Sequence, residues 1–176
     1  QPERAKAISD VLLGAFFEDI NYSADGGLYA ELIQNRDFEY APSDREGDKN
    51  WNSTHSWTLK GDKTTFTIAT TDPIHANNPH YAVLNVERPG AALENTGFDG
   101  IALNVGEKYD FSIFARVPQG QSNKLQVRLV DGEGNICGET SLTVSSRQWK
   151  TYKTVITAKA TADTRLEIIP QSAGEL

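Results

Sequence analysis

The chain has 176 residues, of which 38% are hydrophobic and 23% are charged, which is typical of a globular domain rather than a disordered segment. Its formal net charge of -7 offers no positive surface to phosphates or anionic lipid, so we expect neither nucleic acid nor a membrane as a partner. Its one cysteine, Cys137, excludes an intrachain disulfide, and a chain of this length can bury a core without one.

The N-terminal stretch carries the one helical pattern in the chain. Apolar residues recur there at helical spacing after a glycine pair, at Leu28, Tyr29, Leu32 and Ile33. Asp25 precedes them at a position suited to an N-cap. The pattern therefore predicts one short N-terminal helix.

Period-two patterns dominate from Thr64 onward. In residues 109–117 the odd positions are aromatic or aliphatic and the even ones mostly polar, as in a strand with one buried face. Segments of this kind, bounded by Gly, Pro, Asn and Asp, predict strands at 64–70, 81–86, 100–104, 109–117, 124–130, 136–144, 149–158 and 165–169. Asp131 and Gly132 supply the turn of a hairpin between two of these strands.

Many short strands without interleaved helices favour one fold class. They indicate an all-β domain built as a β-sandwich or jelly roll, rather than a parallel architecture. The longest apolar stretch, residues 11–17, is far shorter than the roughly 20 residues that a membrane-spanning helix needs. We therefore expect no transmembrane segment.

The front of the chain resembles a known enzyme family. Residues 14–21 and 26–36, followed by Phe38 and Glu39, resemble the opening of the α-L-arabinofuranosidases of glycoside hydrolase family 51. The resemblance is to the branch in which a carbohydrate-binding-like module is inserted near the front of the catalytic barrel. It implies that Glu18 and Asn21 bind substrate in the parent enzyme.

The rest of the chain resembles that inserted module. Residues 97–101 and 106–112, together with Trp149 and Tyr152, resemble strands of the galactose-binding-like carbohydrate-binding modules of families 4, 9 and 22. The two resemblances imply two parts. Residues 1–36 are related to the first strand and helix of the parent barrel, and residues 37–176 form the β-sandwich module, truncated before its last strand.

The sequence does not supply a catalytic pair. Retaining glycosidases place two carboxyl groups about 5 to 5.5 Å apart. Glu18 and Asp19 are neighbours on an expected strand, so their side chains point to opposite faces. The catalytic Asn-Glu motif and the nucleophile strand of the family are absent from these 176 residues. We expect no activity from the chain alone.

The resemblance therefore implies a non-catalytic carbohydrate-binding-type module of a retaining α-L-arabinofuranosidase. The parent would remove terminal α-L-arabinofuranosyl residues from arabinan or arabinoxylan. The expected partners are plant cell-wall polysaccharide and the parent catalytic barrel, in a secreted or periplasmic setting, with the cytoplasm as an alternative. The competing interpretation is a structural domain that packs on the barrel and shapes the active-site entrance without binding free glycan.

Aromatic residues among polar ones are the candidates for holding a sugar, because sugars stack on aromatic faces and hydrogen-bond through hydroxyls. Trp51 and Trp57 lie in a stretch rich in amides and hydroxyls and are the leading platform candidates. Tyr81, with Asn78 near it, is the next candidate. Trp149 begins an expected strand and is assigned to the core.

Metal and cofactor signals are weak. His55, His75 and His80 lack a second ligand at the spacing that zinc-binding helices use, so we assign no metal ligand and expect no cofactor. Related modules hold a structural calcium near the Phe-Glu opening of the sandwich, and the resemblance implies Glu39 as its ligand. Cys137 lies within an expected strand and is interpreted as a small buried hydrophobic residue.

Overall fold

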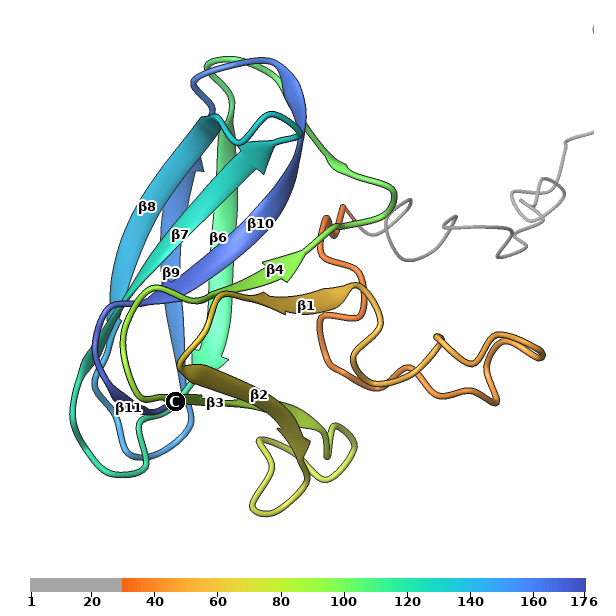
Figure 1. Cartoon of the computed structure of the whole chain (residues 1–176), viewed down its shortest axis with the longest axis vertical. Coiled ribbons are helices and arrows are strands. Elements are labelled where there is room, and N and C mark those ends of the chain that lie inside the picture. Colours follow the sequence, from red (N-terminus) through yellow and green to blue (C-terminus); the bar gives the residue numbers. More distant parts are fainter. Residues whose placement is uncertain (1–29) are drawn as a thin grey trace, which may run out of the picture.

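Strands make up the regular structure of residues 30–176, the part of the chain that the computed structural model describes, and this part contains no helix. The prediction of an all-β domain is confirmed. In chain order the strands are β1 (Trp57–Lys60), β2 (Thr64–Ala69), β3 (Tyr81–Val86), β4 (Ala92–Asn95), β5 (Ile101–Leu103), β6 (Lys108–Ala115), β7 (Asn123–Asp131), β8 (Ile136–Val144), β9 (Lys150–Thr157), β10 (Ala162–Pro170) and β11 (Gly174–Glu175) (Figure 1).

The largest sheet has the order β1-β4-β10-β7-β8, with β5 pairing with β10 beyond the end of β4. All of its pairings are antiparallel, and one of the longest without interruption joins Thr164–Pro170 of β10 to Leu125–Asp131 of β7. The expected hairpin between β7 and β8 is also present, with a bulge between Leu129 and Val130. At its turn Asp131 Oδ1 accepts the backbone N–H groups of Glu133 and Asn135 at 2.9 and 2.8 Å.

Two smaller sheets complete the domain. β6 pairs with β9 along eight residues, and β3 lies between β2 and β11. In Figure 1, β6 and β9 run behind β7 and β10, while β2, β3 and the C-terminus lie at the lower end of the molecule. The layers form a sandwich because apolar residues of both pack into one core.

The core lies between the large sheet and the β6-β9 sheet. Alternate residues of β7 point inward, and Leu125 and Val127 are fully buried. They pack with Ile156 of β9 and Leu166 of β10. Cys137 joins this cluster at 3% exposure, which confirms its interpretation as a small buried residue.

Three strands are absent from the predicted set: β1, β4 and β11, which are only two to four residues long. In β4 the period-two signal is lost because Leu93, Glu94 and Asn95 are all buried. Glu94 is buried because Arg165 of β10 donates to it from Nε at 2.5 Å. The expectation that the sandwich lacks its last strand remains a prediction.

The predicted N-terminal helix is wrong for the part that can be checked. Leu32 has no regular structure and Ile33 lies in a bend, and Leu28 and Tyr29 fall outside the described residues. Asn35 and Phe38 have φ angles of 52° and 61°, which a right-handed helix excludes. Within residues 30–176 no helix is long and apolar enough to cross a bilayer.

Candidate functional site

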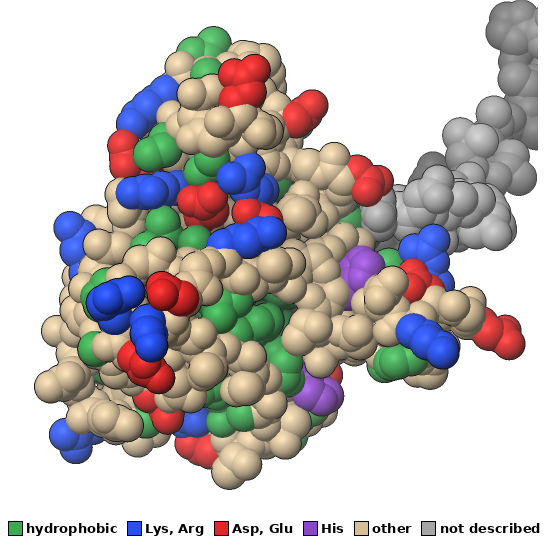
Figure 2. Space-filling model, viewed as in Figure 1, with side chains coloured by type: hydrophobic (Ala, Val, Ile, Leu, Met, Phe, Trp, Pro, Cys, Tyr) green, Lys and Arg blue, Asp and Glu red, His purple; other side chains and the backbone are tan. Residues whose placement is uncertain are grey.

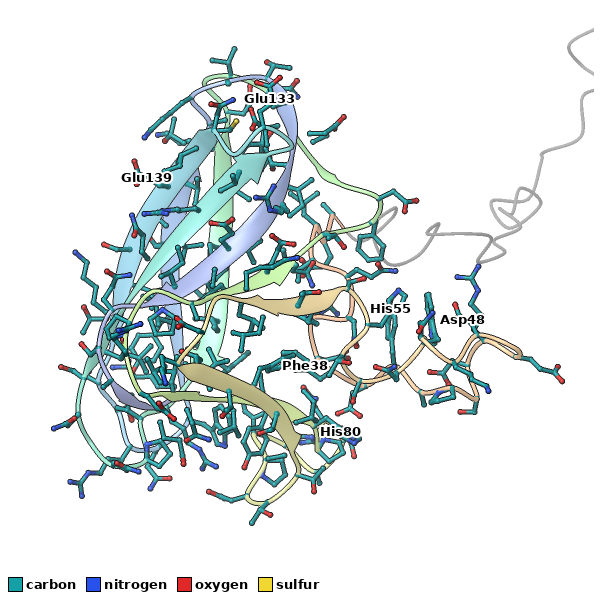
Figure 3. All side chains as sticks on the ribbon, viewed as in Figure 1. Phe38, Asp48, His55, His80, Glu133 and Glu139 are labelled. Atoms are coloured by element: carbon teal, nitrogen blue, oxygen red, sulfur yellow. The ribbon has the colours of Figure 1, made fainter. Side chains whose placement is uncertain are left out.

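The candidate site is built on an irregular segment, residues 33–56, which leaves the sandwich and returns to it before β1 (Figure 3). The segment is ordered by one fully buried amide, Asn35. Its Nδ2 donates to the carbonyl oxygens of Asn52, Ser53 and His55 at 3.3, 3.0 and 3.1 Å. Its Oδ1 accepts the backbone N–H of Tyr40 at 3.2 Å. Both the oxygen and the nitrogen of this amide are used. Asn35 therefore holds the beginning of the loop to its end.

Aromatic rings stack at the base of this loop around Trp51. Tyr40 lies parallel to the indole, with ring centroids 4.5 Å apart and an interplanar angle of 15°. The ring of His55 is also 4.5 Å away, tilted by 44°. The guanidinium of Arg45 lies over the indole at 5.1 Å from its centroid. Trp51 is therefore held in place by ring contacts and remains only half-buried.

A pocket of about 450 Å³ opens beside Trp51. It is lined by two segments of the chain, and their lining residues are Gln34, Arg45, Trp51, His55, Ser56, Thr96, Gly97, Asp99 and Gly100. This volume is within the range of small-molecule sites.

Gln34 gives the pocket a polar group without a partner. The side chain is only 3% exposed, and its Oε1 accepts the Ser56 hydroxyl at 2.5 Å. Its Nε2 is buried and has no hydrogen-bond partner among the described residues. An unmade hydrogen bond of a buried group costs about 1–3 kcal/mol, so a small shift that brings Nε2 to the pocket and to a ligand oxygen would be favourable.

The segment 96–100 forms the other side of the pocket and has a constrained backbone. Gly97, Asp99 and Gly100 have φ angles of 64°, 60° and 119°. A Cβ on Gly97 would lie 2.7 Å from Ile101 Cγ1 and 2.9 Å from the Leu32 carbonyl oxygen. Asn95 anchors the segment, because its Oδ1 accepts Gly97 N–H at 2.9 Å and its Nδ2 donates to the Gln34 carbonyl at 3.0 Å.

The pocket offers both donors and acceptors. Gln34 Nε2 and the Arg45 guanidinium are donors, and the exposed carboxylate of Asp99 is an acceptor. His55 donates from Nδ1 to the Asn50 carbonyl at 3.0 Å, which leaves Nε2 of the neutral ring as a second acceptor. An aromatic face with mixed donors and acceptors suits vicinal hydroxyl groups better than a simple anion.

Trp57, the second platform candidate, has a different place. Its Nε1 donates to the Asn35 carbonyl at 2.9 Å, and its ring lies 5.2 Å from that of Phe38. It packs against both hydrophobic clusters of the domain and is not among the residues that line the pocket. Trp57 therefore anchors the loop at Asn35 to the sandwich and does not itself line the pocket.

Asn78 and Tyr81 lie in and just after the β2–β3 connection and do not join the Trp51 pocket. Asn78 Nδ2 donates to the Asp37 carbonyl at 3.0 Å and to Glu39 Oε1 at 2.8 Å. Tyr81 donates its hydroxyl to the Thr71 carbonyl at 2.5 Å. Both side chains fasten loops.

Trp149 is not in the core, contrary to the prediction. Its Nε1 donates to the Asp72 carbonyl at 2.9 Å, and its ring meets Tyr81 edge-on at 5.0 Å between centroids. The Arg116 guanidinium covers it at 4.4 Å and forms an ion pair with Asp72. The indole is therefore held at the periphery by the β2–β3 connection.

The carboxylate of Glu39 is satisfied by nitrogen donors in this structure, and the expectation of a calcium ion near it remains a prediction. Its Oε1 accepts Asn78 Nδ2 and the His80 backbone N–H, and its Oε2 accepts His80 Nδ1 at 2.6 Å. These partners are nitrogen donors, whereas calcium needs six to eight oxygen ligands. No group of three or more His, Cys, Asp or Glu in residues 30–176 is arranged to hold a metal ion. Burial raises the pKa of Glu39, but the hydrogen bonds from His80 and Asn78 outweigh it, and the pKa lies below its usual value.

A second, larger hollow of about 560 Å³ lies on the outer face of β7 and β8. Its lining is polar and contains no aromatic ring: Lys124, Gln126, Glu139, Thr140, Ser141 and Gln171. Figure 2 shows acidic and basic side chains interspersed over this face of the large sheet.

Of the predicted site residues, the structure brings only Trp51 to a pocket. Glu18 and Asn21 lie outside the described residues. Sequence reasoning missed Gln34, Arg45 and Asp99. Only Asp99 carried a signal, as part of a tight Gly-Phe-Asp-Gly turn.

The chain is similar to known proteins over most of its length. A family model described as a carbohydrate binding domain matches residues 30–173. The chain is 35% identical over 175 residues to an extracellular exo-α-L-arabinofuranosidase of Streptomyces chartreusis, a match that covers 98% of this chain and 20% of that enzyme. It is 25% identical over 183 residues to α-L-arabinofuranosidase 1 of Arabidopsis thaliana, covering 97% of this chain and 26% of that enzyme.

The fold is shared with a solved structure of an arabinofuranosidase. It is the arabinose-bound MgGH51 α-L-arabinofuranosidase, which superposes with a TM-score of 0.75 at 24% identity, over 90% of this chain and 27% of that one. The chain thus spans between a fifth and roughly a quarter of the length of the relatives it matches.

Proposed function

The chain belongs to the carbohydrate binding domain family, and we propose that it is a non-catalytic module that binds glycan in the Trp51 pocket. The observation that carries this proposal is the half-buried indole of Trp51 in a pocket that Gln34, Arg45 and Asp99 also line. One part of the lining therefore offers an aromatic ring, and the rest offers amide, guanidinium and carboxylate groups. A sugar ring can satisfy both, through its C–H surface and a hydroxyl oxygen.

The proposed glycan is a plant cell-wall polysaccharide that carries arabinose or xylose, such as arabinoxylan or arabinan. The relatives named above are α-L-arabinofuranosidases, and the one from Streptomyces chartreusis is described as extracellular. The parent protein is therefore proposed to be a secreted enzyme that hydrolyses terminal α-L-arabinofuranosyl residues. In it, the N-terminal segment with Glu18 and Asn21 would belong to the catalytic barrel and contact substrate, and the sandwich with its 33–56 loop would hold the polymer nearby.

The module is proposed to do no chemistry by itself. In the Trp51 pocket, Asp99 is the one carboxylic acid among the lining residues. Retaining hydrolysis needs a pair of carboxyl groups about 5 to 5.5 Å apart. Release of nitrophenol from nitrophenyl α-L-arabinofuranoside by the purified 176-residue chain would contradict this part of the proposal.

Affinity electrophoresis of the chain in gels with and without arabinoxylan or arabinan tests glycan binding. We expect retardation by at least one polymer, loss of it in Trp51→Ala, and no change in Trp149→Phe, which alters an indole remote from the pocket. Gln34→Glu keeps an acceptor for Ser56 but replaces the Nε2 donor with an oxygen and adds a negative charge at a buried position. We expect it to weaken binding by about tenfold or more, since a donor is lost and a buried charge is introduced.

Retention of native far-UV circular dichroism by each variant is required before its binding is interpreted. Retardation that survives both Trp51→Ala and Gln34→Glu would move the site elsewhere. An absence of retardation by every polymer would favour the competing role, a structural domain that shapes the entrance of the parent active site.

A further inference from the structure

The Trp51 pocket has a single aromatic platform. Trp51 and His55 are its only lining residues with rings, and His55 is tilted against the indole rather than lying level with it. Tyr40 stacks on the indole but does not line the pocket. The pocket can therefore present one ring-sized stacking surface to a ligand.

The large sheet provides no row of platforms to extend this surface. The hollow on β7 and β8 has no aromatic lining, and the neighbouring outward side chains are engaged with one another. Arg165 binds Glu94 at 2.5 Å and Glu167 at 3.3 Å, and Lys159 binds Glu139 at 2.7 Å. Figure 2 shows this face as alternating acidic and basic side chains. A linear polysaccharide lying along β7 and β8 would meet ion pairs and no ring to stack on.

The hydrogen-bonding groups also belong to the same pocket as the indole. Gln34 Nε2, the Arg45 guanidinium and the Asp99 carboxylate belong to residues that line the same pocket as Trp51. The Arg45 guanidinium lies over the indole, so a stacked sugar would displace it toward the hydroxyls at the edge of the ring. The cost is small, since an exposed cation–π contact contributes about 0.5–1 kcal/mol.

From these observations, and resting on the proposed function, we propose that the pocket binds a single terminal pentosyl residue, at a chain end or on a side branch, rather than a run of polysaccharide backbone. One stacking surface with clustered polar groups matches one sugar unit. Affinity then depends on the presence of the terminal residue and not on the length of the chain behind it.

Isothermal titration calorimetry with defined sugars tests this proposal. The ligands are methyl α-L-arabinofuranoside, linear α-1,5-arabino-oligosaccharides of two to six units, and linear xylo-oligosaccharides of the same lengths. We expect the dissociation constant for one of the two series to change less than threefold from two units to six. We also expect the corresponding monosaccharide glycoside, methyl α-L-arabinofuranoside or methyl β-D-xyloside, to displace the polymer completely.

Two controls separate this inference from the proposed function. Lys124→Ala combined with Gln126→Ala alters the hollow on β7 and β8, and we expect no change in affinity. An affinity that rises tenfold or more with oligosaccharide length, or that is lost in this double variant, would overturn end-on binding while leaving glycan binding intact. An absence of binding to every sugar and polymer would overturn the proposed function and this inference with it.

Discussion

The sandwich and the 33–56 loop achieve order by different physical means. In the sandwich, apolar side chains such as Leu125, Val127 and Val144 are fully buried between two sheets. In the loop, backbone groups without strand partners are satisfied by the side chain of Asn35, which makes four hydrogen bonds. The first kind of order is spread over many contacts and the second is concentrated in one residue.

A buried asparagine plays the same role at two other places where an irregular segment meets the sheet. Asn95 joins the 96–100 segment to Gln34, and Asn123 accepts the N–H groups of Gln171 and Ser172 at 3.1 and 3.2 Å. Both asparagines are almost fully buried. The pocket lies where the segments held by Asn35 and Asn95 meet, so its shape depends on amides while the stability of the domain depends on apolar packing.

Leu125→Ala should give the largest loss of stability. Removing a fully buried leucine from a packed core costs about 2–5 kcal/mol of unfolding free energy. Urea denaturation followed by far-UV circular dichroism measures it, and Ser141→Ala, at an exposed position of the same sheet, should change it by less than about 0.5 kcal/mol. Binding at the Trp51 pocket, measured well below the transition, should persist. Its loss in a folded Leu125→Ala protein would show that the two regions are not separate.

Asn35→Gly should disturb the loop and the binding site while leaving the core of the sandwich intact. Glycine tolerates the φ of 52°, so the variant removes the four side-chain hydrogen bonds without adding backbone strain. We expect a cost of about 2–3 kcal/mol, with faster amide hydrogen exchange in residues 36–56 and loss of binding, while β7 and β10 remain protected. Asn104→Gly, at an exposed position, is the control. Native exchange throughout 36–56 would mean that Asn35 does not organise the loop.

The sequence predicts the sandwich far better than the site. The predicted bounds of β3 and β8 match the observed ones, because each run of strand-forming residues is bounded by turn-forming residues. β4 cannot be predicted from local sequence, because Glu94 is buried only through its contact with Arg165, 71 residues away. Trp149 was assigned incorrectly for a similar reason, since its indole is positioned by the Asp72 carbonyl, 77 residues away.

Within the pocket, Trp51 could be predicted from the local sequence and Gln34 could not. Trp51 stands out from its polar neighbours in the sequence alone. Gln34 shows no signal, because its burial and its free Nε2 arise from contacts with Ser56 and Asn95. Such contacts join segments that only the completed fold brings together.

Gly97→Ala tests whether close packing also shapes the pocket. Alanine adds left-handed strain of about 1–2 kcal/mol at a φ of 64°, and its Cβ would meet Ile101 and the Leu32 carbonyl. Gly106→Ala adds comparable strain at a φ of 85°, but nothing lies within 4 Å of its Cβ. Thermal melting should therefore show Gly97→Ala as less stable than Gly106→Ala by about 1–3 kcal/mol, with sugar binding weakened only in the former. Equal melting temperatures of the two variants would mean that the 96–100 segment accommodates the added Cβ without loss of stability.

The smallest expected effect concerns how Glu39 fastens the loop to the β2–β3 connection. Its folded-state pKa is lowered, so the carboxylate contributes stability above the unfolded value of 4.5, and this contribution is lost as the pH falls through the lower, folded-state pKa. Glu39→Gln should therefore lower stability by about 1 kcal/mol at pH 7 and have progressively less effect as the pH falls below 4.5. Other carboxylates with lowered pKa values, such as Asp131, are present in both proteins and cancel in the difference.

Melting temperatures from pH 7 to pH 3 measure this difference in stability between the wild-type chain and Glu39→Gln. EDTA is the control, and we expect it to change the melting temperature of neither protein. If EDTA destabilises the wild-type chain but not Glu39→Gln, a calcium ion binds Glu39. The hydrogen bonds to Asn78 and His80 would then not be what connects the loop to the β2–β3 connection.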